Sequence, residues 1–281
     1  MPAIELASGE VHSWCVRLDV PPETAAGCCA ALTDDERNRS ARLRFTGDWR
    51  RFVVTRGVLR ELLGRYLRTH PGEVRFVYNT FGKPALSPEF GSRLTFNVSH
   101  SGDLALIAIA TDSDIGVDLE CIREQPDYVE IARRFFSAAE VDQLYRLPSH
   151  LHAQAFLSCW TRKEAYAKAR GEGLALLFAS GDITPARGWS LYTLLPAPGY
   201  VGALVIRGSG WHLTQWRWQI APSMDHDCPP FRSHDSITLV ESRLSGVGIS
   251  LAPAARNSNG AGICRRHSAS GRNGNGSAFS P

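Results

Sequence analysis

The order of the predicted strands and helices constrains the fold more than any other feature of this sequence. A strand–helix–strand order occurs twice, once on each side of about residue 113. The long helix of each copy is predicted over 49–70 and 152–170. Each of these helices carries a Thr-Arg pair, Thr55-Arg56 in the first and Thr161-Arg162 in the second. The pattern hints at an internal duplication, although the two halves share too little sequence to establish one.

Shorter elements fill out the two halves. A strand is predicted over 11–20 and a short helix over 32–45, with Thr33 as its N-cap. Successive strands over 93–102 and 104–122 break at Ser101-Gly102 and at the turn 112–114. Helices are expected over 127–135 and 138–147, Gly171 closes the long second helix, and late strands follow over 189–208 and 211–221.

The last part of the chain has a different composition. Residues 223–281 are rich in Ser, Gly, Asn and Arg and have few apolar side chains to bury. Such a segment cannot offset the entropy lost on ordering, so we expect a disordered tail. The alternative is a tail without any biological role.

Composition excludes several classes of protein. A net charge of +3 is too weak to indicate a coat for nucleic acid, and the seven cysteines show no C-x-x-C metal spacing. The first residues lack the basic and apolar regions of a signal peptide, and no apolar run approaches the roughly 20 residues of a membrane span. We therefore expect a soluble, cytoplasmic protein with reduced thiols.

Two acids lie two residues apart in IGVDLECI. Asp118 and Glu120 fall on a predicted strand, so both point to one face while Val117 and Leu119 point to the other. Adjacent carboxylates repel each other unless a positive charge lies between them, which favours a Mg²⁺ site. The alternative is a solvated strand edge with ordinary acids.

Glu164 is the candidate for a third carboxylate. Trp160, Glu164 and Lys168 form one stripe of the predicted helix at i, i+4 and i+8. The alternative is an ordinary helical ion pair, which stabilises a helix by only ~0.3–0.5 kcal/mol.

Lysine usage favours the functional interpretation. The chain has 31 Lys+Arg, of which three are lysines (Lys83, Lys163 and Lys168), so the other 28 are arginines. A surface ion pair would tolerate arginine, whereas a site that needs a compact charge or a proton donor would not.

Two other motifs carry candidate polar residues. Lys83 lies alone in the turn FGKP. His100 in FNVSHSG could donate to a phosphate or be a structural residue.

Five ordered fragments resemble the 4′-phosphopantetheinyl transferases, specifically the Sfp-type branch. They are FGKP (81–84), FNVSHSG (96–102), IGVDLE (115–120), RRFFSAAE (133–140) and WTRKEAYAKARGEGL (160–174), within a match over roughly 10–220. The resemblance implies an α+β fold, a pseudo-dimer of two similar halves with the active site in the cleft between them. The N-terminal half, 1–113, would bind the nucleotide of coenzyme A, and the C-terminal half, 114–222, would carry the metal and the catalytic residues.

The resemblance also assigns residues. Asp118, Glu120 and Glu164 would bind Mg²⁺ together with the pyrophosphate of coenzyme A, while Lys168 would serve the leaving group. Glu140 matches a proposed general base, although Ser137 and Glu140 also form a capping-box pattern. The residues expected to contact coenzyme A are Arg37, Arg51, Lys83, Ser99, His100 and Lys163.

The implied reaction moves the phosphopantetheine arm of coenzyme A onto a serine of an apo carrier protein, of acyl or peptidyl type, leaving adenosine 3′,5′-bisphosphate. We expect a monomer that carries both halves and binds neither nucleic acid nor membrane. Two alternatives stay open at this point. A metal-dependent nuclease would use the paired acids, but that class usually has a lysine two residues after the second acid, where this chain has Ile122. A non-enzymatic arginine-rich module would bind nucleic acid and leave the acids without a purpose.

Overall fold

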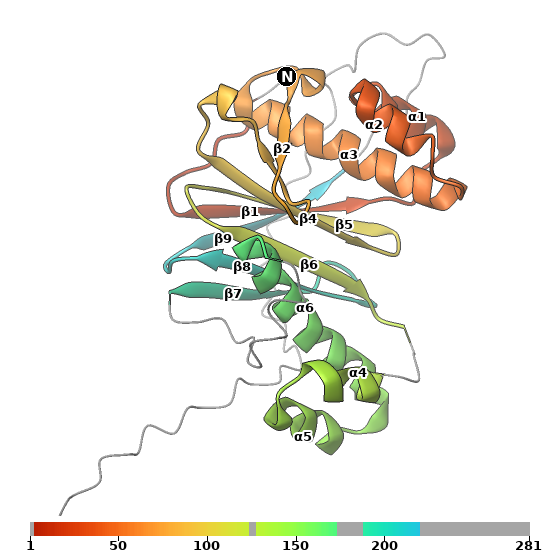
Figure 1. Cartoon of the computed structure of the whole chain (residues 1–281), viewed down its shortest axis with the longest axis vertical. Helices are drawn as coiled ribbons and strands as arrows, with labels where there is room; N and C mark the ends of the chain where they lie inside the picture. The colour runs from red at the N-terminus through yellow and green to blue at the C-terminus, as the bar shows by residue number, and fades with distance from the viewer. Residues whose placement is uncertain (1–2, 124–127, 173–187, 220–281) are drawn as a thin grey trace, which may run out of the picture.

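A computed structural model describes residues 3–123, 128–172 and 188–219 of the chain. The predicted tail over 223–281 and the last two residues of the fragment that ends at 174 lie outside these ranges. Two larger sheets, each covered by one long helix, and a separate two-stranded sheet make up the strands of the described part of the molecule (Figure 1).

The first sheet is formed mostly by the N-terminal half. Its strands are β1 (Glu10–Arg17), β4 (Leu94–Ser101), β5 (Leu104–Thr111) and β9 (His212–Trp218), in the order β4-β5-β1-β9. Helix α3 (Thr46–Leu67) packs on this sheet, with α1 (Pro22–Cys29) and α2 (Asp34–Ser40) beside it (Figure 1). A hairpin of β2 (Phe76–Tyr78) and β3 (Pro84–Leu86) follows α3 and carries the FGKP turn.

The second sheet has the order β6-β8-β7. Its strands are β6 (Ile115–Cys121), β8 (Tyr200–Arg207) and β7 (Trp189–Leu194), all antiparallel to their neighbours. Helix α6 (His152–Arg170) packs against β6 and β8, while α4 (Tyr128–Phe135) and α5 (Ala138–Arg146) lie near the start of α6 (Figure 1).

The two halves repeat the same order of elements. A strand, two short helices, a long helix and an antiparallel strand pair occur as β1-α1-α2-α3-β4-β5 and again as β6-α4-α5-α6-β7-β8. The first helices begin at residues 22 and 128, and the long helices at 46 and 152, so both pairs are 106 residues apart. The Thr-Arg pairs have the same spacing. The predicted α+β pseudo-dimer is therefore confirmed.

One strand does not pair within the half of the sequence to which it belongs. Strand β9 lies in the stretch assigned to the C-terminal half, 114–222, yet it pairs in parallel with β1 of the first sheet. Trp216 of β9 stacks on Trp14 of β1 with ring centroids 5.5 Å apart. The pairing with β9 covers an edge of β1 that would otherwise expose unpaired backbone groups.

One apolar core joins the halves. Leu106 and Ala108 of β5 pack with Val117 and Leu119 of β6 and with Leu204 of β8. The predicted alternation of β6 is thus confirmed, because Val117 and Leu119 are buried in this core while Asp118 forms its contacts on the other face, with α6 and β4.

Most predicted helices are confirmed within a few residues. Thr33 caps α2 in a capping box with Glu36, although α2 ends at Ser40 rather than 45. Gly171 ends α6 in the left-handed conformation, with φ 70°. Helix α1 was not predicted, because its eight residues include no Val, Leu, Ile, Met or aromatic side chain that could mark an apolar stripe. None of the helices in the described ranges is long and apolar enough to span a membrane.

Candidate active site

Strand β6 brings two acids against α6. Gly116 allows the close approach, because a Cβ at this position would lie 2.0 Å from the carbonyl oxygen of Ala165 and 2.3 Å from the amide nitrogen of Ala169. Asp118 and Glu120 follow on the same face of the strand. The strand and the helix therefore hold these carboxylates beside the side chains of Glu164 and Lys168.

Asp118 is the centre of the cluster. Its Oδ1 accepts hydrogen bonds from Lys168 Nζ at 2.6 Å and from the hydroxyl of Ser99 at 2.8 Å. The Nζ of Lys168 also donates to Ser99 Oγ at 3.1 Å. The second oxygen, Oδ2, is buried and accepts no hydrogen bond from the described residues. A buried carboxylate oxygen without a donor costs free energy unless a cation or water reaches it.

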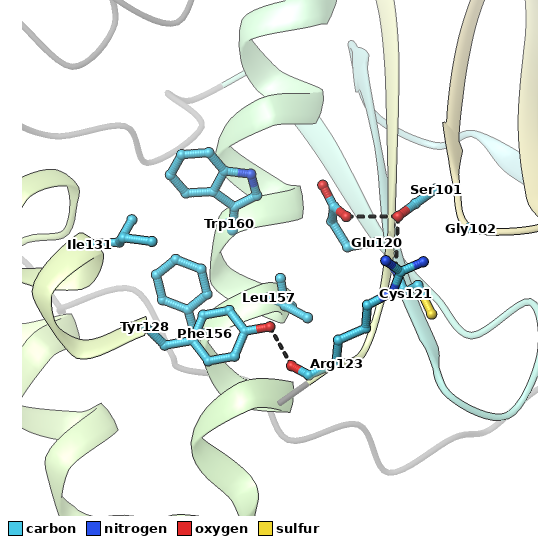
Figure 2. Close-up of a pocket in the computed structure, with 10 residues that line it drawn as sticks. All are labelled: Ser101, Gly102, Glu120, Cys121, Arg123, Tyr128, Ile131, Phe156, Leu157 and Trp160. Atoms are coloured by element: carbon cyan, nitrogen blue, oxygen red, sulfur yellow. Dashed lines mark hydrogen bonds between the residues drawn. The ribbon is translucent and has the colours of Figure 1, made fainter. Parts of the chain in front are cut away.

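Glu120 lies two residues further along β6. Its Oε2 accepts a hydrogen bond of 2.8 Å from the hydroxyl of Ser101, which Figure 2 shows at the edge of the pocket. Burial raises the pKa of Glu120, Asp118 raises it further, and the Ser101 hydroxyl opposes both effects.

Glu164 completes the group of acids. Burial raises its pKa to about 7, and the nearby carboxylates of Asp118 and Glu120 contribute to the rise, while Lys168 counteracts it. Three carboxylates thus interact through space with one ammonium group, so the cluster holds more negative than positive charge.

The donor set fits a hard divalent cation. Carboxylate oxygens are the ligands that Mg²⁺ prefers, and a cation there would supply the missing partner of Asp118 Oδ2. In the described part of the chain no group of three acid, histidine or cysteine side chains is arranged to hold a metal ion by itself, and Lys168 lies against Asp118. Completing the coordination would require oxygen atoms from a substrate or from water.

Three of the residues expected to bind coenzyme A lie beside this cluster. Ser99 contacts Asp118 and Lys168, as described above. The His100 side chain is exposed at the surface, yet enough protein surrounds the ring to lower its pKa, and the charges of Lys168 and Arg51 lower it further. Arg51 donates from Nε to the carbonyl oxygen of Gly102 at 2.8 Å. This brings a guanidinium group close to the turn that follows β4.

Lys83 lies between the two halves. Its Nζ donates to the carbonyl oxygens of Ile115 at 3.0 Å and of Ala169 at 3.3 Å. Burial lowers its pKa, and Asp114 partly counteracts that effect. The side chain therefore ties the FGKP turn to the start of β6 and the end of α6.

Glu140 and Lys163 contact each other rather than the acid cluster. Lys163 Nζ lies 3.0 Å from Glu140 Oε2 and over the ring of Phe136. Glu140 also accepts from the backbone of Ser137 at 2.8 Å, as the predicted capping box requires, and from the thiol of Cys159 at 3.3 Å. Burial pushes the pKa of Glu140 up, but Lys163 and these hydrogen bonds outweigh it and lower the pKa overall.

Arg37 makes local contacts. Its guanidinium donates to the carbonyl oxygen of Leu32 and pairs with Asp34 at 2.7 Å. These contacts join the start of α2 to the preceding loop, and they do not connect Arg37 to the acid cluster.

A pocket of about 290 Å³ opens beside Glu120. Figure 2 shows a polar wall from the ends of β4 and β6, and an apolar wall from α4 and α6. The lining residues are Ser101, Gly102, Glu120, Cys121, Arg123, Tyr128, Ile131, Phe156, Leu157 and Trp160. The pocket therefore presents hydrogen-bonding groups on one side and apolar side chains on the other.

Two features of the site were not predicted from the sequence. The first is Ser101, although Asn97, Ser99 and Ser101 alternate along β4 and so share a face. The second is the apolar wall, whose residues Tyr128, Ile131 and Phe156 resemble ordinary core positions in the sequence.

Both halves of the chain match family models of known proteins. Residues 114–214 match the model of the 4′-phosphopantetheinyl transferase superfamily, and residues 22–112 match that of a 4′-phosphopantetheinyl transferase N-terminal region. The 4′-phosphopantetheinyl transferase HetI of Nostoc is 40% identical over 227 residues, which cover 77% of this chain and 96% of that protein.

More distant relatives match shorter parts. The 4′-phosphopantetheinyl transferase Sfp of Bacillus subtilis is 29% identical over 52% of this chain and 62% of its own length. The transferase AcpT of Escherichia coli K12 is 35% identical over 44% of this chain and 64% of its own length. These matches give no support to the nuclease or the nucleic-acid-binding alternative. This chain therefore belongs to the 4′-phosphopantetheinyl transferase family.

Proposed function

We propose that this chain transfers the 4′-phosphopantetheine arm of coenzyme A to a serine of an apo carrier protein and releases adenosine 3′,5′-bisphosphate. The observation that carries the proposal is the excess of acids around Lys168, one of which, Glu120, lines a pocket that is polar on one side and apolar on the other. A pyrophosphate would match the acids through a divalent cation that offsets their excess negative charge, and a flexible arm would match the pocket.

The reaction exchanges one phosphorus–oxygen bond for another. The serine oxygen of the carrier protein forms a bond to the phosphorus next to the pantetheine, and the pyrophosphate bond to the nucleotide breaks. The serine proton passes to a base, and the departing phosphate receives a proton or a matching positive charge. None of these steps needs a covalent intermediate with the protein.

Asp118, Glu120 and Glu164 are proposed to hold Mg²⁺. A bound Mg²⁺ would neutralise charge on the pyrophosphate. The burial that raises the pKa of Glu164 to about 7 favours a cation next to this carboxylate, because an isolated charge there is disfavoured.

Lys168 is proposed to stabilise the leaving phosphate. An ammonium group has three N–H donors, and the contacts with Asp118 and Ser99 use two of them. The side chain is 30% exposed, so the third donor can reach a substrate in the cleft. Its contact with Asp118 fixes the ammonium beside the proposed metal ligands.

The nucleotide is proposed to lie on the N-terminal half, 1–113, while the C-terminal half, 114–222, holds the metal and the arm. His100 and Arg51 are the best-placed candidates for phosphate contacts, because the charges of Lys168 and Arg51 both act on His100 and Arg51 contacts Gly102 in the turn that follows β4. Ser99, Lys83, Lys163 and Arg37 complete the proposed set. Of these, Lys83 and Lys163 would act by fixing the turn and the helix that they contact.

Glu140 is proposed as the general base for the carrier serine. The carboxylate is ionised at neutral pH, as a base requires, and the contacts that lower its pKa also make it a weaker base. Lys163 and Cys159 hold its two oxygens, and burial raises the pKa of the Cys159 thiol to about 12, so the thiol stays a donor.

A monomer is proposed, because both sheets contribute to one core within a single chain. A cytoplasmic location is proposed as well, on the basis of the five free cysteines in the described ranges.

A gel assay tests the proposal directly. The protein is incubated with a fluorescent coenzyme A, Mg²⁺ and an apo carrier protein, with a second carrier in which the target serine is replaced by alanine. Labelling of the first carrier alone, abolished by a metal chelator, is the expected result. Equal labelling of both carriers, or none of either across acyl and peptidyl types, would refute it.

A further inference from the structure

Strands β4 and β6 lie side by side although they belong to different sheets. Side chains from one face of β4 replace the backbone ladder between them. The side-chain oxygen of Asn97 accepts from the amide of Val117 at 2.9 Å, and the hydroxyl of Ser101 accepts from the amide of Cys121 at 3.1 Å. Between them, Ser99 donates to Asp118. We call this row of contacts the β4–β6 seam.

Ser101 differs from Asn97 in what it does with its hydrogen-bonding groups. A hydroxyl has one proton and two acceptor positions. Because the Cys121 amide occupies an acceptor position of Ser101, the single proton is free to point at Glu120 Oε2, 2.8 Å away. Figure 2 shows both hydrogen bonds meeting at this hydroxyl. The backbone of β6 therefore orients the hydroxyl, and the hydroxyl fixes one oxygen of Glu120.

We propose that Ser101 is a positioning residue that holds Glu120 in the orientation needed to bind a divalent cation. This inference rests on the proposed function, in which Asp118, Glu120 and Glu164 are the metal ligands. Glutamate has three rotatable side-chain bonds, so a free Glu120 would lose more conformational entropy on binding a metal than one already held. Since β4 belongs to the N-terminal half, the seam also makes the metal ligands of one half depend on a strand of the other.

The test measures metal affinity without coenzyme A. Mn²⁺ is titrated into the full chain and its free concentration is followed by electron paramagnetic resonance, alongside thermal melting and the dependence of transfer on Mg²⁺. Ser101→Ala should weaken Mn²⁺ binding about 10-fold, in the range typical for residues that orient a metal ligand. It should raise the Mg²⁺ concentration for half-maximal rate by a similar factor, with little change in kcat at saturating Mg²⁺.

Asn97→Ala is the matched control. It removes the other backbone contact of the seam, at Val117, without touching an acid. It should lower the melting temperature at least as much as Ser101→Ala, yet keep Mn²⁺ affinity within about 2-fold of the wild type. Ser101→Thr, which retains a hydroxyl, should restore Mn²⁺ affinity. Ser101→Cys has a weaker hydrogen-bond donor and should also weaken Mn²⁺ binding. Its Mn²⁺ affinity tests the inference if Ser101→Ala does not fold.

Two outcomes overturn the inference. Wild-type Mn²⁺ affinity in Ser101→Ala or Ser101→Cys would show that Glu120 needs no such support, and an equal loss in Asn97→Ala would show that only the seam matters. Asp118→Ala separates this inference from the proposed function. If Asp118→Ala abolishes Mn²⁺ binding while Ser101→Ala leaves it intact, only the role of Ser101 is wrong. If neither variant changes binding, the proposed metal site is wrong as well.

Discussion

The two halves of the molecule build the same layer of strand and helix but fill it differently. In the N-terminal half, Trp14 and Val16 of β1 pack against Val58 and Leu62 of α3 in a closed core. Moving 106 residues along the chain places Glu120 at the position of Trp14. The same step places Glu164 at the position of Val58 and Lys168 at that of Leu62. Equivalent positions between the strand and the long helix therefore hold apolar side chains in the N-terminal half and charged side chains in the C-terminal half.

Buried charges are also balanced differently. In the N-terminal half, Glu36 lies between Arg56 at 3.2 Å and Arg60 at 2.6 Å, and Glu61 pairs with Arg65 at 3.0 Å. In the C-terminal half, the acids at 118, 120 and 164 interact with the single ammonium of Lys168. We infer that the N-terminal charges serve stability, whereas the C-terminal cluster has given up stability to bind a charged ligand.

The kind of cation follows the same division. Arg60 uses its fixed geometry to contact Glu36 and the carbonyl oxygens of Pro71 and Val74. Such a planar group suits several acceptors at fixed positions, while the compact ammonium of lysine can turn toward a substrate. This would explain why a chain with 28 arginines among its 31 basic residues keeps a lysine at 168.

The largest expected effect comes from removing an acid of the cluster. Glu164→Ala or Asp118→Ala should reduce transfer by about 10³-fold or more, because the pyrophosphate charge then lacks its proposed metal. The melting temperature should stay near that of the wild type, since the acids repel each other in the folded state. Rates of carrier labelling and melting curves of the same samples are compared at low Mg²⁺.

Glu36→Ala provides the mirror experiment in the N-terminal half. It leaves Arg56 and Arg60 buried without their acid, which should destabilise the protein by about 3–5 kcal/mol. Transfer per folded molecule should be retained. Two results would contradict this comparison of the halves. One is a near-normal transfer rate in both Glu164→Ala and Asp118→Ala, and the other is loss of transfer by folded Glu36→Ala.

The next largest effect is expected from exchanging the cations. Lys168→Arg should keep the ion pair with Asp118 and bind coenzyme A almost normally, yet transfer about 10²-fold more slowly. The planar group places its charge differently and stays protonated, so it cannot give a proton to the leaving phosphate. Binding by calorimetry and single-turnover rates measure the two parts. Transfer at the wild-type rate would mean that the ammonium of Lys168 is not needed for chemistry.

Glu140 and Lys163 test whether their contact is structural or chemical. Glu140→Gln and Lys163→Met should each lower the melting temperature, because the ion pair is buried. The double variant should recover much of the stability but should stay about 10²-fold slow, because the proposed base is still absent. A double variant that also recovers its rate would show that the pair acts only by holding α5 on α6.

Local patterns in the sequence were sufficient for much of the fold. The period of a strand places Asp118 and Glu120 on one face, and Gly171 ends α6 where its left-handed conformation suits glycine. Local patterns did not predict the contacts between segments that are distant in the sequence. Strand β9 crosses to the first sheet, and Ser101 meets Glu120 although the two strands are not paired by their backbones. The periodicity of a strand does not indicate which edge strands become neighbours. The contacts of the polar β4 side chains with β6 could therefore not be predicted from the sequence.

A smaller effect is expected from pH in the C-terminal half. The pKa of Glu164 is about 7, against 4.5 for an ordinary glutamate, so the folded state holds a proton that the unfolded state releases. Stability should therefore fall as pH rises from about 4.5 to 7. Glu164→Gln lacks this loss, and its melting temperature in metal-free buffer should exceed that of the wild type by about 2–4 °C at pH 8 but not at pH 4.5. Parallel curves for the two proteins would contradict the raised pKa.

The smallest effect should run in the opposite direction, in the N-terminal half. His12, 106 residues before Asp118, is buried, and its Nδ1 lies 2.6 Å from the hydroxyl of Tyr66. That hydroxyl accepts from the indole of Trp14, which leaves its own proton for an unprotonated His12. Burial lowers the pKa of His12, although Glu10 partly counteracts the effect.

Below about pH 6.5 the unfolded chain therefore binds a proton at His12 that the folded protein excludes, and stability should fall as pH decreases. His12→Gln cannot titrate and can still accept from Tyr66. Its melting temperature, relative to the wild type, should rise by about 1–2 °C between pH 7 and pH 5. Glu164→Gln should show the opposite trend over the same range, gaining on the wild type as pH increases. If both variants follow the wild type with the same slope, the two halves do not differ in how they bury charge.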